Sequence, residues 1–325
     1  MNKNSNLFKE LSFSDINKII SEFFGKKITF KYQLMTGGLF NTTYRVEILD
    51  TNEILILRVG PINIHLLLPF EENLMKGERY AYSLCENSDV PCPEILKCDT
   101  SKKLITRDYM IVKFIDNKPL SEISSDEDIQ PELYEYLGKV VNKLHKITNN
   151  KFGRAYDINN NKGFNSWSEF IINEFNDVKN RLIEFNLFNQ DELDKCEDIL
   201  HSNSNLLDEI TVASLVHADL WAGNVLVNYK NNTPKLAAII DMDRSLFGDP
   251  DFEFANQWIT NSYFFKGYGV SDEISHKRVI RRKIYKLLYS LIDSYVWNIE
   301  YNNPKAFQDE KNNVLKTLNE LLNSN

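Results

Sequence analysis

The sequence predicts an α+β fold of two lobes: an antiparallel β-sheet lobe with one packed helix, followed by a larger, mainly helical lobe. Three observations support this prediction. The chain has 325 residues, enough for roughly two lobes of ordinary size. Runs rich in β-branched and aromatic residues gather before residue 116, and helical spacing of apolar residues dominates after residue 131. We therefore expect one lobe over residues 1–115 and a second over residues 116–325.

The first lobe should begin with a short helix within residues 12–25, where serine and aspartate can cap it and Gly25 ends it. The next three β-rich runs are punctuated by glycine, asparagine and aspartate, which predicts an antiparallel meander; they are residues 28–35, 41–49 and 53–60. Residues 69–88 have helical periodicity, and a further strand pair is expected around residues 103–116.

The second lobe should be built mainly of amphipathic helices. Apolar residues recur at helical spacing after Pro131, again over residues 167–185, and again over residues 280–295. The basic run at residues 276–286 fits the last of these helices, and we expect its charges to form a solvated face rather than a nucleic-acid patch. His145 lies on an apolar helical stripe and is expected to be structural.

Composition restricts the function. The formal net charge of −8 disfavours nucleic acid and anionic membrane surfaces as partners, and it suits a cationic small substrate. No apolar run is long enough to span a membrane or to form a signal peptide, so we expect a cytoplasmic protein with no membrane partner. The four cysteines show no CxxC pair and no zinc-ligand spacing, which indicates reduced thiols that fill space.

Polar residues precede or follow two apolar runs in the second lobe. Asp219 and Asn224 stand before the run at residues 225–227, and Asp241 follows the run at residues 236–240. If these runs form a hairpin, Asn224 and Asp241 meet at one end and can bind a hard cation. Mg²⁺ takes its remaining ligands from water and substrate phosphates, which points to a nucleoside triphosphate. Asp219 would then be free to accept a proton, and His217 would brace the loop.

Taken one at a time, these residues also suit ordinary turns. Their joint spacing resembles the aminoglycoside phosphotransferase and choline kinase family of small-molecule kinases, which have a protein-kinase-like fold. The matching positions, in chain order, are His217, Asp219, Leu220, Gly223, Asn224, Ile240, Asp241, Asp243, Gly248, Asp249 and Pro250.

The resemblance implies transfer of the γ-phosphoryl group from ATP or GTP to a hydroxyl of a small molecule. Asp219 would be the catalytic base, and Asn224 and Asp241 would hold Mg²⁺. Asp243 would either touch a second metal or support the loop. Glu253 stands where the family often has aspartate, so its role stays open.

The first lobe offers candidates for a nucleotide clamp. Gly37 and Gly38 lie between two strands, where backbone amides can approach phosphate, although adjacent glycines between strands more often form a plain hairpin turn. Arg58 and Glu78 are charges on faces expected to be buried, so we expect them to pair. The pair resembles the lysine and glutamate pair of kinases. Because lysine is usual there, whether Arg58 contacts the nucleotide or only organises the lobe stays open.

The acceptor is harder to predict. Residues 249–274 mix acids with aromatic residues and could form its binding wall or simply pack in the core. We expect an antibiotic, an aminoglycoside or a macrolide, with a metabolite such as choline, thiamine or homoserine as the alternative. A catalytically silent kinase-like binding module is a further alternative. A histidine-metal hydrolase is disfavoured because no second histidine stands at ligand spacing near His217.

Overall fold

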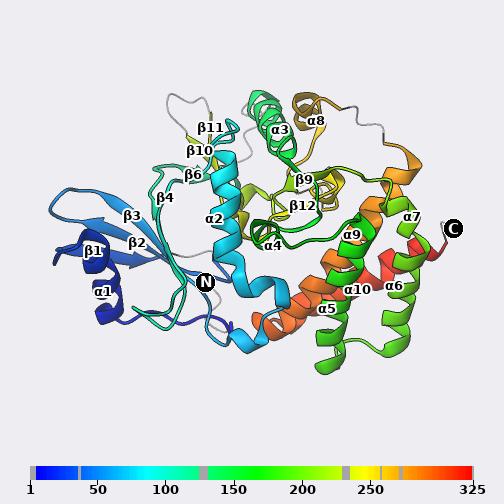
Figure 1. The fold of residues 1–325 in the computed structure, drawn as a ribbon, viewed down its shortest axis with the longest axis horizontal. Helices are drawn as coiled ribbons and strands as arrows, with labels where there is room; N and C mark the ends of the chain where they lie inside the picture. Colours follow the sequence, from blue (N-terminus) through cyan, green and yellow to red (C-terminus); the bar gives the residue numbers. More distant parts are fainter. Residues whose placement is uncertain are drawn as a thin grey trace.

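The computed structural model describes residues 5–35, 38–123, 131–228, 235–256, 258–270 and 274–323. A sheet lobe lies on one side of α2 (Leu74–Cys85), and a larger helical lobe lies on the other (Figure 1). The predicted α+β fold of two lobes is confirmed. Among the described residues, no helix is long and apolar enough to cross a membrane.

The first sheet has five antiparallel strands in the order β1-β2-β3-β5-β4. They are β1 (Phe30–Leu34), β2 (Thr42–Ile48), β3 (Ile54–Val59), β4 (Ile95–Asp99) and β5 (Tyr109–Lys113). Along β2 and β3 every second side chain is fully buried, because one face of the sheet packs against a helix. The predicted meander is therefore present in β1, β2 and β3.

Helix α1 (Phe13–Phe24) covers that buried face. Ser12 caps its start by accepting a hydrogen bond from the N–H of Asp15, and Gly25 ends it with φ of 65°. Three isoleucines on one side of the helix are completely buried, and together with the sheet they form a small separate core; they are Ile16, Ile19 and Ile20.

The predicted strand pair around residues 103–116 is only half correct. β5 lies there, but its partner β4 comes earlier in the chain, and residues 100–108 form an irregular connection. Arg107 in this connection is buried and donates hydrogen bonds to Lys9 O, Gly60 O and Thr42 Oγ1. A side chain that joins three separate segments in this way holds the connection out of the sheet.

The second lobe contains two further small antiparallel sheets, ordered β11-β10-β6 and β7-β9-β12-β8. Their strands are β6 (Lys118–Pro119), β7 (Thr148–Asn149), β8 (Gly153–Arg154), β9 (Ala213–Val216), β10 (Val225–Asn228), β11 (Lys235–Ile239) and β12 (Leu246–Gly248). The helices are α3 (Pro131–His145), α4 (Ala155–Asn159), α5 (Trp167–Glu184), α6 (Gln190–Ser202), α7 (Ser204–Leu207), α8 (Ser262–Tyr268), α9 (His276–Tyr295) and α10 (Pro304–Leu322).

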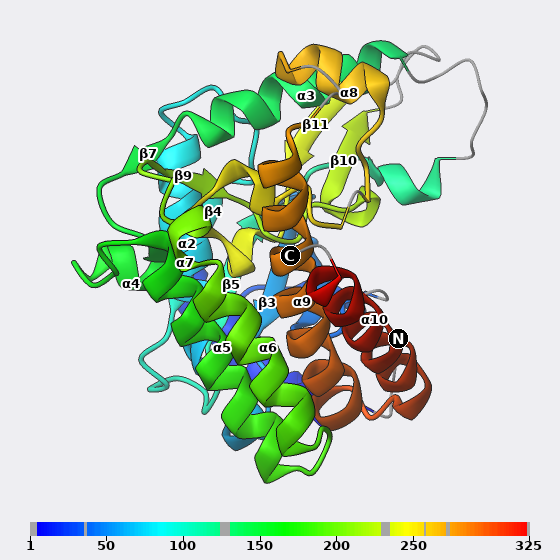
Figure 2. The ribbon, with the colours of Figure 1, turned by 90° about the vertical axis from the view of Figure 1, so that its right-hand side faces the viewer.

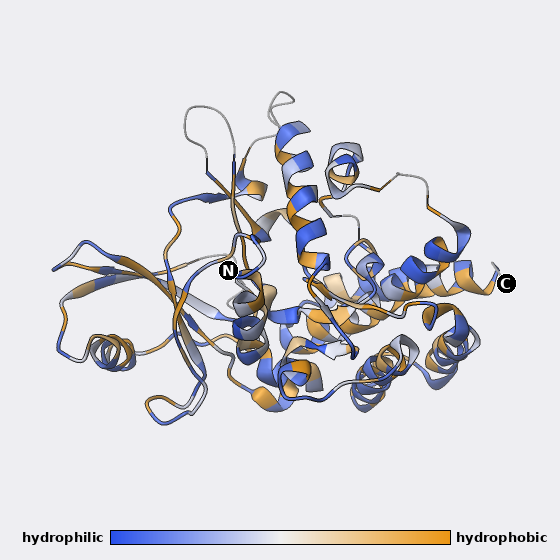
Figure 3. Cartoon of the chain, turned by 45° about the horizontal axis from the view of Figure 1, so that its top comes forward, coloured by the Kyte–Doolittle hydropathy of each residue, from blue (hydrophilic) through white to orange (hydrophobic). Residues whose placement is uncertain are grey.

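Helices α5, α6, α9 and α10 pack side by side in this lobe (Figure 2). A short π-helix, Val296–Glu300, continues α9. The helices at the surface show both hydrophilic and hydrophobic stretches, as expected of amphipathic helices (Figure 3). Their apolar sides build the larger core, which also takes in Leu7, Ala81 and Cys85 from the N-terminal part of the chain.

The start of the chain therefore crosses to the helical lobe. The Asn6 N–H donates to Glu300 O at 2.8 Å, and its side-chain amide donates to Ile299 O at 2.7 Å. The next residue, Leu7, has no exposed surface. Residues 5–7, which we call the N-terminal strap, thus tie the sheet lobe to the end of the π-helix.

Candidate active site

The two apolar runs that flank the polar residues form the predicted hairpin. β10 and β11 are antiparallel, with Val225 opposite Ile239. The Ile240 N–H donates to Asn224 O at 2.9 Å, so Asp241 follows directly after the residue that faces Asn224. Asp241 has φ of 64°, a conformation that residues other than glycine adopt rarely and that often marks a functional site. The sequence prediction that Asn224 and Asp241 stand at the same end of a hairpin is confirmed.

Asp219 is held against Asn224. The Asn224 side-chain amide donates to Asp219 O at 2.8 Å and to Asp219 Oδ2 at 3.0 Å. Burial raises the pKa of Asp219 to about 7, and the positive charge of Arg244 opposes that rise. A carboxyl with a pKa near neutrality is suited to accept a proton in the physiological range.

His217 braces this loop, as the sequence analysis expects. Its Nδ1 accepts a hydrogen bond from the Asp219 N–H at 3.2 Å, so Nε2 carries the ring proton and donates to Ile240 O at 2.9 Å. The ring is completely buried. One imidazole therefore joins the Asp219 loop to the residue before Asp241.

Two further residues, Ala218 and Gly223, shape the backbone of this loop. Ala218 has φ of 63°, and its carbonyl oxygen accepts a hydrogen bond from the Tyr289 hydroxyl of α9. A Cβ atom at Gly223 would lie 2.2 Å from the indole ring of Trp221, so only glycine lets that ring fold over the loop.

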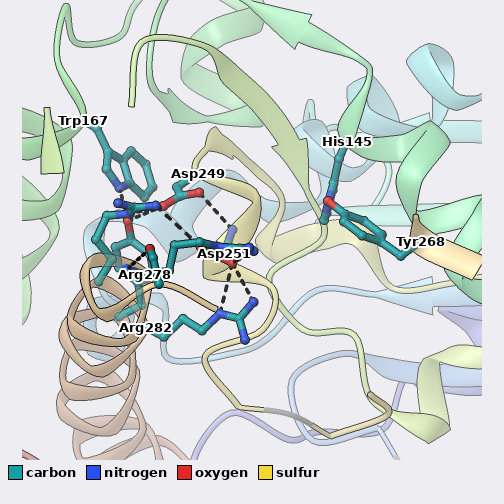
Figure 4. A network of polar contacts seen from close by, with 10 residues as sticks. His145, Trp167, Asp249, Asp251, Tyr268, Arg278 and Arg282 are labelled. Carbon is teal, nitrogen blue, oxygen red and sulfur yellow. Dashed lines mark hydrogen bonds and ion pairs between the residues drawn. The ribbon is translucent and has the colours of Figure 1, made fainter. Parts of the chain in front are cut away.

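Glu253 supports the same loop from behind, a role that the sequence left open. Its carboxylate accepts a hydrogen bond from the His217 N–H at 2.8 Å and lies 3.6 Å from Nε2 of His145. The contact with His145 and the hydrogen bond from the His217 N–H outweigh burial and lower the pKa of Glu253. His145 itself is buried, and its Nδ1 forms a 2.7 Å hydrogen bond with the Tyr268 hydroxyl, so the prediction of a structural histidine is confirmed (Figure 4).

Arg58 of β3 forms the predicted ion pair with Glu78 of α2, whose side chain has no exposed surface. It also pairs with Asp241, which the sequence did not predict, and lies 3.9 Å from Asp243. The Asp241 N–H in turn donates to the Tyr82 hydroxyl of α2 at 2.8 Å. Arg58 and α2 therefore connect the sheet lobe directly to Asp241.

Of the two glycines expected between strands, Gly37 lies outside the described residues. Gly38 follows β1, and a Cβ atom there would approach Asn41 O to 3.0 Å, tighter than most real contacts. The close approach of two backbone segments accounts for glycine at position 38.

The prediction that the basic run of α9 is a solvated face is wrong for two of its arginines, although His276, Lys277 and Lys286 are exposed. Arg281 and Arg282 are buried, because they pair with Asp249 and Asp251 of the segment after β12 (Figure 4). The Tyr285 hydroxyl donates to Asp249 Oδ2 at 2.8 Å as well. Asp249 is therefore held in place by side chains of α9.

Arg244 also lies close to the site, and the sequence did not single it out. Its guanidinium lies 3.5 Å from Asp293 of α9 and 3.6 Å from Glu71. Burial raises the pKa of Asp293 to about 6, although Arg244 opposes the rise. Arg244 is also the main positive charge that acts on Asp219, so it balances several carboxyl groups at once.

The site fits Mg²⁺ through a small protein ligand set. The Asn224 amide nitrogen faces Asp219, which leaves its oxygen for a cation, and the Asp241 side chain is 39% exposed. Within the described residues, no group of three or more histidine, cysteine, aspartate or glutamate side chains could hold a metal. The ion would therefore need phosphate oxygens or water as further ligands, as Mg²⁺ usually does.

Two tryptophans near Asp219 are exposed. Trp221, two residues after Asp219, is 43% exposed, and Trp258 is 47% exposed. The Trp258 ring lies 6.2 Å from the ring of Tyr289, which bonds to the Asp219 loop. In contrast, Phe264 and Tyr268 are core residues. Residues 249–274 thus contribute both exposed aromatic surface and core packing.

The comparison with protein families decides the identity of the fold and the chemistry. Residues 31–271 match the model of the phosphotransferase enzyme family. The chain belongs to this family. It is a small-molecule kinase with the kinase-like fold of that family. The sequence predictions of the fold and of the enzyme class are confirmed. None of the curated proteins compared with the chain matches it.

Solved structures of low sequence identity share the fold. Aminoglycoside phosphotransferase APH(4)-Ia, in a ternary complex with AMP-PNP and hygromycin B, is 18% identical, with a TM-score of 0.66 over 94% of this chain and 98% of that chain. Ethanolamine kinase from Plasmodium vivax is 14% identical, with a TM-score of 0.67 over 97% and 90%. A putative fructosamine-3-kinase from Thermobifida fusca YX-ER1 is 16% identical, with a TM-score of 0.64 over 94% and 100%.

Proposed function

We propose that this phosphotransferase moves the γ-phosphoryl group of ATP or GTP to a hydroxyl group of a cationic small molecule. The observation that carries the proposal is the position of Asp219, whose carboxylate is held at Asn224 beside the hairpin end that bears Asp241. Related structures with AMP-PNP and with GDP support a nucleoside triphosphate as donor.

In this proposal Asp219 orients the acceptor hydroxyl and takes its proton. Asn224 and Asp241 would hold Mg²⁺, which when bound neutralises charge on the phosphates. Arg58 contacts phosphate once it is released from Asp241, while Glu78 continues to hold its guanidinium. Positioning and electrostatic stabilisation supply most of the rate acceleration in such a site.

We place the nucleotide between the two lobes, residues 1–115 and 116–325, with Gly37 and Gly38 in the loop nearest the phosphates. Two observations support a division between the lobes near residue 116 and a site between them. Arg58 reaches across from β3 to Asp241. β6, just after residue 116, pairs with β10 of the catalytic hairpin.

For the acceptor we propose an antibiotic that carries amino groups, an aminoglycoside or a macrolide. Asp293 and Asp241 both act electrostatically on Asp219, and although Arg244 opposes them, the group of carboxyl side chains around the base suits a cation. The related APH(4)-Ia and APH(2'')-IIa structures contain hygromycin B and gentamicin, respectively.

A metabolite kinase is the second candidate, and the exposed indoles of Trp221 and Trp258 favour it. Aromatic faces bind quaternary ammonium groups such as that of choline. The same surfaces would also suit the dimethylamino sugar of a macrolide, so only an assay separates the two.

The test is a turnover screen with Mg²⁺ and either ATP or GTP. The panel contains aminoglycosides, macrolides, choline, ethanolamine, thiamine and homoserine, and mass spectrometry of the product locates the phosphate. Asp219→Asn is the negative control. Equal turnover in Asp219→Asn would refute the assigned base. Calorimetric binding of the Mg²⁺ nucleotide without turnover on any acceptor would favour a silent binding module instead.

A further inference from the structure

Two cysteines lie together at the end of α2. Cys85 is the last residue of the helix and is completely buried, and Cys92 lies in the connection that follows and is partly exposed. The Cys92 thiol lies 3.8 Å from the backbone oxygen of Tyr82, three residues before Cys85, and each thiol shifts the pKa of the other. Both cysteines are free, as are Cys98 and Cys196. The sequence alone indicated only thiols that fill space, but this pair brings two reactive groups together.

The pair also lies against the segment that carries Asp241, the proposed metal ligand. The Cys85 sulfur is 3.8 Å from the sulfur of Met242, the residue after Asp241. The Cys92 thiol donates to the backbone oxygen of Tyr82 at 3.8 Å, and the hydroxyl of Tyr82 accepts from the Asp241 N–H. Cys85 therefore contacts the neighbour of Asp241 directly, and Cys92 is connected to Asp241 through Tyr82.

A backbone hydrogen bond strengthens this link. The Ile239 N–H at the end of β11 donates to Pro91 O, directly before Cys92, at 2.8 Å. The connection that contains Cys92 is thus attached to the strand that leads into Asp241. If Cys92 moves relative to Cys85, the movement should therefore displace both ends of the segment from Ile239 to Met242.

The two thiols differ in the way that a reactive pair requires. The neighbouring thiol of Cys85 lowers the pKa of Cys92, whereas the Cys92 thiol and burial raise the pKa of Cys85. Thiolates are the nucleophiles in thiol oxidation, and Cys92 is also the more accessible of the two. Cys98, which is also partly exposed, has no such partner among the contacts described, and burial raises its pKa to about 11.

We propose that Cys85 and Cys92 are a redox modification site that closes to a disulfide and weakens binding of the Mg²⁺ nucleotide. The oxidant is a hydroperoxide. The Cys92 sulfur attacks it and forms a sulfenic acid, with release of one alcohol or water molecule. The Cys85 sulfur then displaces the sulfenic hydroxyl as water, and the disulfide bond forms. The effect on nucleotide binding rests on the proposed function, whereas formation of the disulfide does not.

Disulfide formation changes the packing next to Asp241. Bonded sulfur atoms lie only about 2.0 Å apart, so the Cys85 sulfur must turn towards Cys92 and away from Met242. The contact that packs Met242 against α2 is then lost. Asp241, between Met242 and the hairpin, shifts relative to Asn224, and reduction of the disulfide restores it.

The first measurement detects the disulfide itself. Trypsin releases residues 80–97 as one peptide that contains both cysteines, and Cys98 falls in the next peptide. After treatment with hydrogen peroxide, we expect this peptide to be about 2 Da lighter, and dithiothreitol should reverse the change. The shift should vanish in Cys92→Ser and persist in Cys98→Ser, the matched control. A peptide of unchanged mass, or one with only added oxygen, overturns the proposal.

The second measurement tests the link to the site. Oxidation should raise the Kd for the Mg²⁺ nucleotide about tenfold in the native protein and in Cys98→Ser, but not in Cys92→Ser. Hydrogen exchange of a peptide that spans residues 240–244 should become faster, because the Asp241 N–H loses its bond to Tyr82. A disulfide that leaves this exchange unchanged overturns the link. If the reduced protein binds no nucleotide, the proposed function fails, while mass and exchange still decide this inference.

Discussion

The carboxylate of Glu253 accepts a hydrogen bond from the backbone N–H of His217 at 2.8 Å. The segment after β12 thereby fixes the start of the Asp219 loop. Glu253 is buried, and it is also 3.6 Å from His145 of α3. The loop that carries Asp219, the proposed base, is therefore held by Glu253, which takes no part in the proposed proton transfer.

Replacing Glu253 should loosen the loop. In Glu253→Ala the buried His217 N–H loses its acceptor, which costs about 1–3 kcal/mol of unfolding free energy, and kcat should fall as well. Glu253→Gln keeps an oxygen acceptor and should lose less unfolding free energy and less kcat than Glu253→Ala. Urea denaturation and steady-state kinetics on the three proteins check this. Equal losses in the two variants would contradict it.

Asp219→Asn should remove the base without harming the fold. We expect kcat to fall by about 10²- to 10⁴-fold. The unfolding free energy should not decrease, because burial already disfavours the charged form of Asp219, as its raised pKa shows. Asp177→Asn is the matched control, since burial also raises the pKa of Asp177 but it lies on α5, outside the site. Loss of activity in both variants would indicate a general effect of lost carboxylates.

The ion pair of Arg58 and Glu78 should be required for stability. Arg58→Met leaves the fully buried Glu78 without its cation, and we expect a loss of about 3 kcal/mol in unfolding free energy by urea denaturation. Arg58→Met combined with Glu78→Leu should recover part of it. Arg45→Met is the control on the neighbouring strand, because Arg45 and Glu47 form a partly exposed pair and should contribute at most about 1 kcal/mol.

Asp293 should make stability depend on pH. Its pKa is about 6 in the folded protein and lies above the usual value of 3.8, so the folded state binds the proton more tightly. The stabilisation is complete below the usual pKa and is lost as pH rises through about 6. Relative to Asp293→Asn, the native protein should therefore lose about 1 kcal/mol between about pH 5 and about pH 8. Urea denaturation at the two pH values checks this, and a difference of opposite sign would contradict it.

The contact of α3 with α8 should tolerate no side chain at Gly138. A Cβ atom there would lie 2.1 Å from Phe264 O, so Gly138→Ala should force the helices apart and lower the melting temperature. Gly77→Ala in α2 is the control. Its Cβ would meet its nearest neighbour at 3.4 Å, an ordinary contact, and alanine should favour the helix by up to about 1 kcal/mol. Calorimetry compares the two.

Local patterns were enough to predict much of this molecule. The caps of α1, the meander and the β10–β11 hairpin all follow from residues that are near one another in sequence. The pairing of Arg58 with Glu78 was predictable for another reason. Two charges on buried faces cost too much unless they meet, and the structure brings them together.

Contacts between distant segments were not predictable in the same way. Arg281 and Arg282 have the spacing of a solvated helix face, and nothing near them in sequence indicates that Asp249 and Asp251 will cover them. β4 was misplaced because the inward side chain of Arg107 bonds to segments far away in the chain. Recognition of such pairs requires the packing of the whole chain.

The N-terminal strap has a mechanical consequence. Through the bonds of Asn6 to the π-helix, the strap joins the two lobes in addition to Arg58 and Tyr82, which both bond to Asp241. Lobes that are joined at several separate places should admit and release the nucleotide by a small tilt rather than by free separation or twisting.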